Sequence, residues 1–202
     1  MKSIDDIQKL KAVVCYVLGK SQGGMDYIHL FKSMYFAQQE HLVKYGLPLF
    51  NDTFVVRKHG PVPSLTYKVI RCVEGKNTEL TIGLEEFISA LNIVERDGHQ
   101  IVSLNQGVTY DEDELSVSNI KTLDRCVSEC LAIESFELSK LSHQDAAFKK
   151  ARKKAMETGE DTCIPLFDIA KAGGASDSML EIIRERQINK RVITCWNNSY
   201  RK

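Results

Sequence analysis

The strongest constraint on the fold comes from residues 31–63, where a predicted helix is followed by a glycine, a proline and a strand. Apolar and aromatic side chains recur at three- and four-residue steps from about residue 26 to residue 45, which predicts a helix with one buried face. Gly46 can adopt the left-handed conformation that ends many helices, because glycine has no Cβ atom. Pro48 has no backbone N–H and prevents the helix from resuming. The chain is therefore expected to turn sharply after this helix.

A short β element is expected next to the helix. Residues 53–58 have the β-branched and aromatic content of a strand. Residues 60–63 read Gly-Pro-Val-Pro, a rigid connector in which each proline fixes its own φ and favours extended geometry in the residue before it. Further along, Asp97-Gly98 is a strong two-residue turn signal, so residues 93–104 are predicted to form a β-hairpin.

The remaining pattern is helical, and the sequence predicts a mainly α (α+β) fold: a compact helical domain with a small antiparallel β element. Further helices are expected from residue 4 to the glycines at 23 and 24, and at residues 64–73, 83–91, 115–142, 144–158 and 179–190, with one more turn at 165–172. Ser3, Ser64 and Ser142 are placed to cap the helices that follow them, and Asp6 can complete a capping box with Ser3.

Composition is that of an ordinary globular protein. Hydrophobic residues make up 43% and charged residues 27%, and 202 residues suffice to bury a core without disulfides or metals. The apolar runs are short and the N-terminus lacks an apolar signal segment, so we expect no membrane span and a cytoplasmic location. The six cysteines include no C-x-x-C pair and are interpreted as reduced thiols, mostly packed in the core.

Charge is balanced overall but not along the chain. The formal net charge is zero, which argues against a general polyanion binder, yet residues 149–202 hold twelve basic and seven acidic residues. We expect residues 1–150 to form the main domain and residues 151–202 to form a helical extension packed on it. The densest basic run consists of Lys149, Lys150, Arg152, Lys153 and Lys154. At about 100° per residue these charges spread around the helix, which favours a solvated surface over a focused nucleic-acid reader, although an acidic partner is also compatible.

No residue set in the sequence points to a reaction, so we expect neither catalysis nor a bound cofactor or metal. His41 lies on the apolar face of its predicted helix, where a hydrogen-bonded core histidine is more common than a ligand or base. Asp52 follows a turn, and its carboxylate can accept backbone N–H groups. His59 falls in an exposed-looking turn and His143 at a helix end. The spacings among these four residues match no standard metal-ligand motif.

Two segments together resemble one known family. The first consists of Lys32, Tyr35, Phe36, Ala37, His41, Gly46, Pro48, Leu49, Asp52, Phe54 and residues 60–63. The second is Leu141-Ser142-His143, followed by the aromatic Phe148. This ordered pattern resembles the Panacea domain of SocA-like antitoxins, which includes phage-associated GepA-like proteins, and the resemblance covers roughly residues 10–150.

The resemblance implies an antitoxin of a bacterial toxin–antitoxin system. Such a protein neutralises a toxin, usually encoded next to it, by direct protein–protein binding. The family-founding antitoxin is also a proteolytic adaptor that delivers its toxin to a Clp-type protease. The resemblance implies no catalytic residues, and it marks as motif or partner-binding candidates Lys32, Tyr35, Phe36, His41, Asp52, His59, Gly60, Pro61 and His143.

Two other functions remain open at the level of sequence. A DNA-binding regulator would fit the helix-rich pattern and the basic C-terminal segment, although nucleic acid is the less expected partner. A metal-dependent enzyme would have to use His41, His59 and His143. For the antitoxin, a hydrophobic face near the two turns would cover the toxin, and the surface around Asp52 and residues 59–63 is expected to affect partner binding more than folding. Aromatic candidates for that face are Tyr35, Phe36, Tyr45, Phe50 and Phe54.

Overall fold

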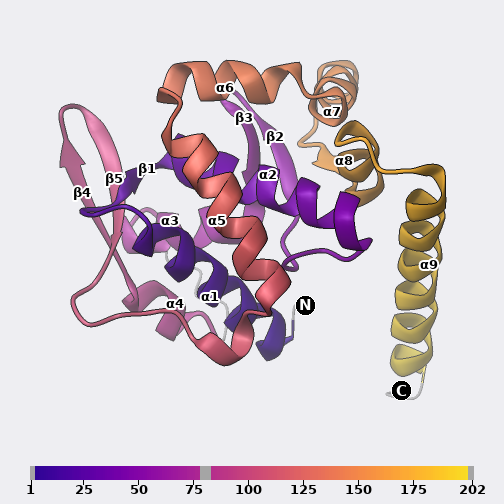
Figure 1. Cartoon of the computed structure of the whole chain (residues 1–202), viewed down its shortest axis with the longest axis horizontal. Helices are drawn as coiled ribbons and strands as arrows, with labels where there is room; N and C mark the ends of the chain where they lie inside the picture. Colours follow the sequence, from indigo (N-terminus) through magenta and orange to yellow (C-terminus); the bar gives the residue numbers. More distant parts are fainter. Residues whose placement is uncertain (1–2, 78–82, 200–202) are drawn as a thin grey trace.

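The computed structural model describes residues 3–77 and 83–199, with side-chain environments up to residue 189, and confirms a mainly α fold with a small antiparallel β component (Figure 1). The helices are α1 Ile4–Gly19, α2 Tyr27–Tyr45, α3 Ser64–Val73, α4 Glu85–Ser89, α5 Val117–Leu131, α6 Ser135–Gln144, α7 Ala146–Thr158, α8 Leu166–Ala172 and α9 Asp177–Ser199, with a 3₁₀ turn at Glu112–Glu114. The strands are β1 Met25–Asp26, β2 Phe54–Arg57, β3 Gly60–Pro63, β4 Leu91–Arg96, β5 His99–Leu104 and β6 Cys163–Ile164.

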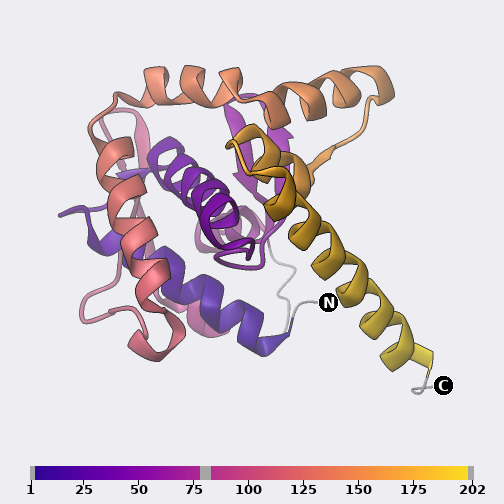
Figure 2. The ribbon, with the colours of Figure 1, turned by 45° about the vertical axis from the view of Figure 1, so that its right-hand side comes forward.

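Helix α2 is the centre of the molecule. It packs against α1, α5, α6, α8 and β3, and Figure 2 shows it passing through the body with these elements around it. Enclosure on several sides buries polar positions of α2 as well as apolar ones, including Lys32 and Gln38. The sequence pattern indicates one buried face, and the structure buries more of the helix than that pattern requires.

The predicted start of α1 and the predicted end of α2 are confirmed, whereas α1 ends at Gly19 and not at the glycines at 23 and 24. Ser3 and Asp6 form a capping box at the start of α1. Asp26 caps α2 by accepting the backbone N–H of His29 at 2.9 Å. Gly46 ends α2 at φ 63°, the left-handed conformation that glycine adopts without a Cβ clash.

Two three-stranded antiparallel sheets flank α2, in the orders β1-β5-β4 and β3-β2-β6. The β4–β5 hairpin turns at Asp97 and Gly98, both at positive φ, as the turn signal predicts. Residues 60–63 form strand β3, so describing them as a connector is incomplete. The prolines are accommodated because β3 is an edge strand, where a missing backbone N–H leaves no neighbour unpaired.

Four expectations about helices are wrong. Residues 115–142 form two helices, α5 and α6, because the turn at 132–134 is held by the tertiary contacts of His29 described below. Ser64 is the first residue of α3 and makes no cap hydrogen bond. The cap of α7 is Asp145, whose carboxylate accepts the N–H of Phe148, and Ser142 instead bonds within α6. Helix α4 is also shorter than predicted, because strand β4 already begins at Leu91.

The segment after α7 lies against the same body. Strand β6 pairs with β2, and Ile169 of α8 is buried beside α2. The first turns of α9 bury Leu180 and Ile183, and Arg186 donates to the carbonyl of Gly46 at 3.1 Å. Farther on, α9 extends away from the other helices (Figure 2). Within the described part of the chain, none of the helices has the length and apolar character that a membrane span needs.

Candidate functional site

The segments that carry the family resemblance meet around the side chain of Lys32. This side chain projects from α2, is 1% exposed, and its Nζ donates to the carbonyl oxygen of Pro61 in β3 at 3.0 Å. On α6, Ser139 donates to the carbonyl of His59 at 3.1 Å, and Ser142 donates to the carbonyl of Ser139 at 2.8 Å. The β2–β3 hairpin is thus fixed between α2 and α6.

Gly60 is required where these three elements meet. Its φ is 106°, a conformation that side chains rarely adopt. A Cβ atom there would lie 2.3 Å from Ser142 Oγ and 2.9 Å from Lys32 Nζ, closer than atoms can approach. Only a glycine lets α6 and Lys32 reach the hairpin together.

Lys32 is a buried amine without a carboxylate partner among the described residues. Burial lowers the pKa of its ammonium group from 10.5 to about 7, against a small opposing effect of the Cys130 thiol. Lysine is rarely this buried unless it is paired, since the desolvation of an ammonium group is costly. The side chain therefore positions β3 at a cost to stability.

His143 lies on α6, and His59 lies in the turn of the β2–β3 hairpin. The ring of His143 stacks on Phe148 at 5.0 Å, and His59 is exposed in the β2–β3 turn. Burial, followed by the charges of Arg152, Lys32 and His59, lowers the pKa of His143 below its ordinary value. A set of three or more His, Cys, Asp or Glu side chains able to hold a metal does not occur among the described residues, so the two histidines and His41 are not brought together there.

Tyr35 and Phe36 have different surroundings. Tyr35 is fully buried, packs edge-on against Phe54 at 5.1 Å, and donates to Asp145 at 2.8 Å. Burial and the Asp145 carboxylate raise the pKa of Tyr35. Phe36 is half-buried and faces the groove described below. Of the five aromatic candidates, Tyr35, Phe50 and Phe54 belong to the core, and Tyr45 is 41% exposed.

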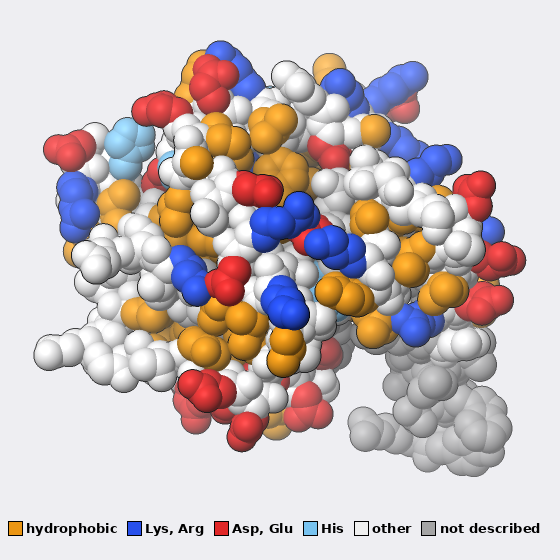
Figure 3. All heavy atoms as spheres, viewed as in Figure 1, with side chains coloured by type: hydrophobic (Ala, Val, Ile, Leu, Met, Phe, Trp, Pro, Cys, Tyr) orange, Lys and Arg blue, Asp and Glu red, His pale blue; other side chains and the backbone are white. Residues whose placement is uncertain are grey.

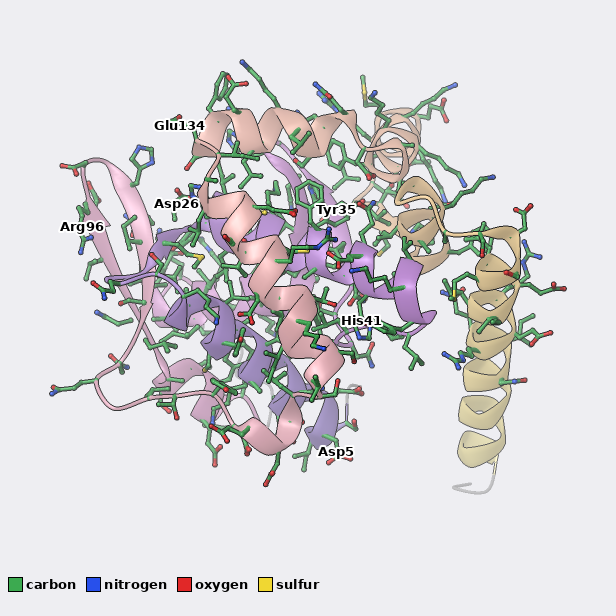
Figure 4. The ribbon with its side chains drawn as sticks, in the orientation of Figure 1. Asp5, Asp26, Tyr35, His41, Arg96 and Glu134 are labelled. Atoms are coloured by element: carbon green, nitrogen blue, oxygen red, sulfur yellow. The ribbon has the colours of Figure 1, made fainter. Side chains whose placement is uncertain are left out.

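His41 is a neutral structural residue. Its Nδ1 lies 2.8 Å from the carbonyl of Leu47 and donates to it, and its Nε2 accepts from the amide of Asn119 at 3.1 Å. Burial lowers the pKa of His41, in agreement with a neutral ring. Lys9 donates in turn to the Asn119 side chain at 2.6 Å. The turn after α2 is thereby fixed to α5 and α1 (Figure 4).

Asp52 caps helix α3 from outside that helix. It is 5% exposed, and its two carboxylate oxygens accept the backbone N–H groups of Leu65 and Thr66, both at 3.0 Å. It also accepts the N–H of Thr53 at 2.7 Å. Asp52 performs the role that the sequence suggests for Ser64. Asp52 and all of β3 are buried, and within residues 59–63 only His59 is exposed, so a role of the surface around Asp52 and residues 59–63 in partner binding stays a prediction.

A polar cluster that the sequence did not indicate lies at the start of α2. His29 Nδ1 is 2.7 Å from the Asp26 carboxylate, and His29 Nε2 is 2.9 Å from the carbonyl of Ile133. The Ser135 hydroxyl donates to the same carboxylate. Figure 4 labels Asp26 at this end of the helix and Glu134 in the turn between α5 and α6. No local signal links Asp26 with a serine more than a hundred residues away, so sequence patterns do not reveal the cluster.

The geometry of this cluster requires a protonated ring. The two ring nitrogens of His29 face the Asp26 carboxylate and the Ile133 carbonyl, both acceptors, and the Ser135 hydroxyl near Nδ1 donates its proton to Asp26, so each ring nitrogen must carry a proton. The bond to Asp26 raises the pKa of His29, although burial opposes it. Burial also works against ionised Asp26, but bonds from His29 and Ser135 outweigh it and lower the pKa of Asp26 far below its ordinary value. Serine, histidine and aspartate are the residue types of a hydrolase triad. In a triad the serine and the aspartate contact different ring nitrogens, whereas here both lie next to Nδ1 of His29, so this is not a catalytic triad.

A groove of about 340 Å³ opens between α2, α5 and α6. Figure 3 shows this face, with hydrophobic side chains set back between charged ones. Its apolar lining includes Phe36, Val43, Cys130, Ile133, Leu138 and Leu141. Leu141 is 44% exposed and belongs to the Leu-Ser-His segment, so one side of α6 fixes the hairpin and the other side forms a groove wall.

A charged network forms the rim of the groove. Glu40 bonds to Lys44 at 2.5 Å and to Arg125, and Cys126 donates to it at 3.0 Å. Burial acts to raise the pKa of Glu40, but these bonds outweigh burial and lower it. Burial raises the pKa of the Cys130 thiol on the floor to about 11, which keeps it protonated and unreactive at neutral pH. The groove thus combines an apolar floor with an ordered polar rim, the anatomy of a protein-binding surface.

Comparison with known families gives one match: a family described as antitoxin SocA-like, Panacea domain, over residues 30–149. The match includes α2 from residue 30 onward, the β2–β3 hairpin, α5 and α6, and therefore both the contacts of Lys32 with the hairpin and the helices that form the groove walls. Comparisons with curated proteins and with solved structures give no significant match.

Proposed function

The chain belongs to the antitoxin SocA-like, Panacea-domain family, and we propose that it neutralises a toxin by binding it through the groove between α2, α5 and α6. In this proposal the protein acts by covering a surface of the toxin, not by catalysis. The toxin is expected to be encoded next to this chain. The observation that carries the proposal is the apolar groove built from helices of the matched region.

The form of the groove supports this choice. It is walled by three helices and presents Leu141 and half-buried Phe36 to solvent. Helix-lined apolar grooves commonly accept an apolar helix face or a few anchoring side chains of a partner. The Glu40 network holds its rim in place, so little ordering entropy is lost on binding.

Co-expression tests the proposal. The neighbouring gene is expressed alone in a bacterial host and then together with this chain, and growth and co-purification are followed. The expected result is growth arrest that this chain relieves, with a complex that purifies at fixed stoichiometry. Arrest without rescue, or rescue without a complex, would refute neutralisation by direct binding.

We further propose a second role for the protein, as an adaptor that delivers its toxin to a Clp-type protease. This is the role of the family-founding antitoxin. The test is the half-life of the toxin with purified protease, with and without this chain. Faster degradation in its presence supports the role, and an unchanged half-life argues against it.

A DNA-binding role is the alternative that one observation favours. Five basic residues of α7 are exposed: Lys149, Lys150, Arg152, Lys153 and Lys154. Binding to promoter DNA that falls steeply with salt would support this alternative. The cations point in several directions around α7, and Lys150 is paired with Asp168 at 2.8 Å, so we rank it below toxin binding.

A further inference from the structure

A second hollow lies between strand β2 and helix α7, away from the toxin-binding groove proposed above. Its volume is about 340 Å³, and it is lined by Val56, Arg57, Lys58, Arg152, Ala155 and Met156. The two hollows have no lining residue in common. We call this set of six residues the β2–α7 patch.

The patch has a positive field. Lys58 and His59 are exposed in the hairpin turn, and Arg152 is exposed on the facing side of α7. Burial, followed by the positive charge of Arg152, lowers the pKa of the neighbouring His143 ring. Arg57 is neutralised by Asp161, whereas Lys58 and Arg152 form no ion pair with any described residue. Figure 3 shows Lys and Arg side chains gathered over α7.

The centre of the patch is apolar. Met156 is 78% exposed, the most exposed large hydrophobic side chain of the described residues, and Val56 and Ala155 beside it are half-buried. Methionine is flexible and polarisable, which suits it to contact with an apolar side chain of a partner. Cations around an apolar centre are complementary to a peptide that carries acidic residues around an apolar one.

We propose that the β2–α7 patch binds an acidic peptide segment of a partner protein, with an apolar side chain of that segment placed against Met156. A nucleic-acid backbone would match the cations but would leave the exposed methionine without a role. This inference does not depend on the toxin-binding groove, since the two surfaces lie on different elements.

The test uses the full chain and two fluorescent twelve-residue peptides. Both are rich in glutamate; one carries two leucines four residues apart, and the other has glutamines in their place. Fluorescence anisotropy measures their affinity, and a labelled DNA duplex serves as the competing ligand class. The leucine peptide is expected to bind more tightly than the glutamine peptide and the duplex.

Variants then locate the binding site. Arg152→Glu and Met156→Gln should each weaken binding of the leucine peptide about tenfold, which corresponds to about 1.4 kcal/mol. Lys121→Glu, an exposed change on α5, and Leu141→Glu in the groove should leave the affinity unchanged. Both patch residues are exposed, so the variants are expected to fold, and thermal unfolding verifies this.

Two outcomes would overturn the proposal. If Arg152→Glu and Met156→Gln fold normally and bind the leucine peptide as the wild type does, the patch is not its site. If the duplex binds more tightly than either peptide, with a steep dependence on salt that Arg152→Glu reduces, the patch is a nucleic-acid surface instead.

Discussion

The ammonium nitrogen of Lys32 and the carbonyl oxygen of Pro61 lie 3.0 Å apart in the interior of the protein, and no described carboxylate neutralises the lysine. One lysine side chain thereby joins the central helix to an edge strand whose prolines cannot donate hydrogen bonds. An apolar side chain of similar length would fill the same space without the desolvation penalty. Lys32 thus lowers the stability of the folded protein relative to an apolar residue at the same position.

The first prediction concerns Lys32→Met. It should raise the free energy of unfolding at pH 7 by about 1–3 kcal/mol, because the desolvation penalty disappears and one hydrogen bond is lost. The unfolded chain keeps the Lys32 proton up to a pKa of 10.5, whereas in the folded protein the pKa is about 7. Wild-type stability should therefore rise relative to the variant as pH increases from about 7 to 10.5.

Chemical denaturation across this pH range measures both effects. Lys121→Met, at an exposed position of α5, is the matched control and should change little at any pH. A Lys32→Met protein less stable than the wild type at pH 7 would show that the bond to Pro61 outweighs the desolvation.

Gly60→Ala is the second prediction. The new Cβ would collide with Ser142 Oγ and Lys32 Nζ, so unfolding should require about 3 kcal/mol less free energy, or the variant should fail to fold. Gly107→Ala is the control, since Gly107 also has positive φ but has nothing within 4 Å of its Cβ position. Gly107→Ala should lower the free energy of unfolding by about 1 kcal/mol, which is the cost of the positive φ alone. Equal losses of thermal stability in both variants would contradict the crowding.

Local signals predicted what depends on local chemistry. The helix end at Gly46, the hairpin at Asp97-Gly98 and the capping box of Ser3 all follow from the conformational preferences of a few adjacent residues. The cap of α3 was not predicted, because Asp52 accepts backbone N–H groups that lie 13 and 14 residues farther along the chain. The local sequence around a serine at a helix start is the same whether that serine or a distant carboxylate caps the helix.

The third prediction separates Asp52 from His59. Asp52→Ala removes the acceptor of three backbone N–H groups in a buried place and should lower the free energy of unfolding by about 2–4 kcal/mol. His59→Ala, in an exposed turn, should change it by less than about 0.5 kcal/mol. Urea unfolding monitored by circular dichroism measures both. A fully stable Asp52→Ala variant would show that the cap of α3 is dispensable.

The fourth prediction is a pH dependence that arises from His29. Its pKa is raised in the folded protein, so its contribution to stability is complete below pH 6.5 and is lost as pH rises through that raised value. His29→Gln should lower the unfolding free energy by about 1–2 kcal/mol at acidic pH and by less at alkaline pH. The facing charges are Asp26 and Glu134, and both favour the protonated ring.

The measurement is the difference in unfolding free energy between wild type and His29→Gln from about pH 5.5 to about pH 9. This range extends from below to well above the ordinary pKa of histidine. Ser135→Ala keeps the imidazolium and should retain the pH dependence. A difference that stays constant with pH would mean that the ring is neutral and that only one of its nitrogens donates.

The turn between α5 and α6 was not predicted, and the contacts of His29 and Asp26 explain why. The apolar stripe continues from Leu131 to Leu138 without glycine or proline, so the pattern alone favours one long helix. The carbonyl of Ile133 instead accepts a hydrogen bond from His29, and the hydroxyl of Ser135 donates one to Asp26. The groove depends on this break, because α6 can form its wall only after the chain has turned. A site formed by helices distant in sequence leaves no spacing to detect.

The last prediction is that Leu141→Glu weakens toxin binding at least about tenfold, since a carboxylate would be buried against the apolar groove. Leu141 is 44% exposed, so the folded state should lose about 1 kcal/mol or less. Val117→Glu, at a 69% exposed position outside the groove lining, is the matched control and should bind and rescue growth as the wild type does. Isothermal titration with the purified toxin measures the affinities.

The pair of variants distinguishes the groove from the toxin-binding function as such. If Leu141→Glu folds, binds the toxin with unchanged affinity and rescues growth, the toxin is neutralised by another surface, and Arg152→Glu in the β2–α7 patch is the next variant to measure. If both apolar-to-acidic changes weaken binding equally, the effect comes from added negative charge and not from the groove. A loss confined to Leu141→Glu is the result that the helix-walled groove requires, because of the two residues Leu141 alone lines it.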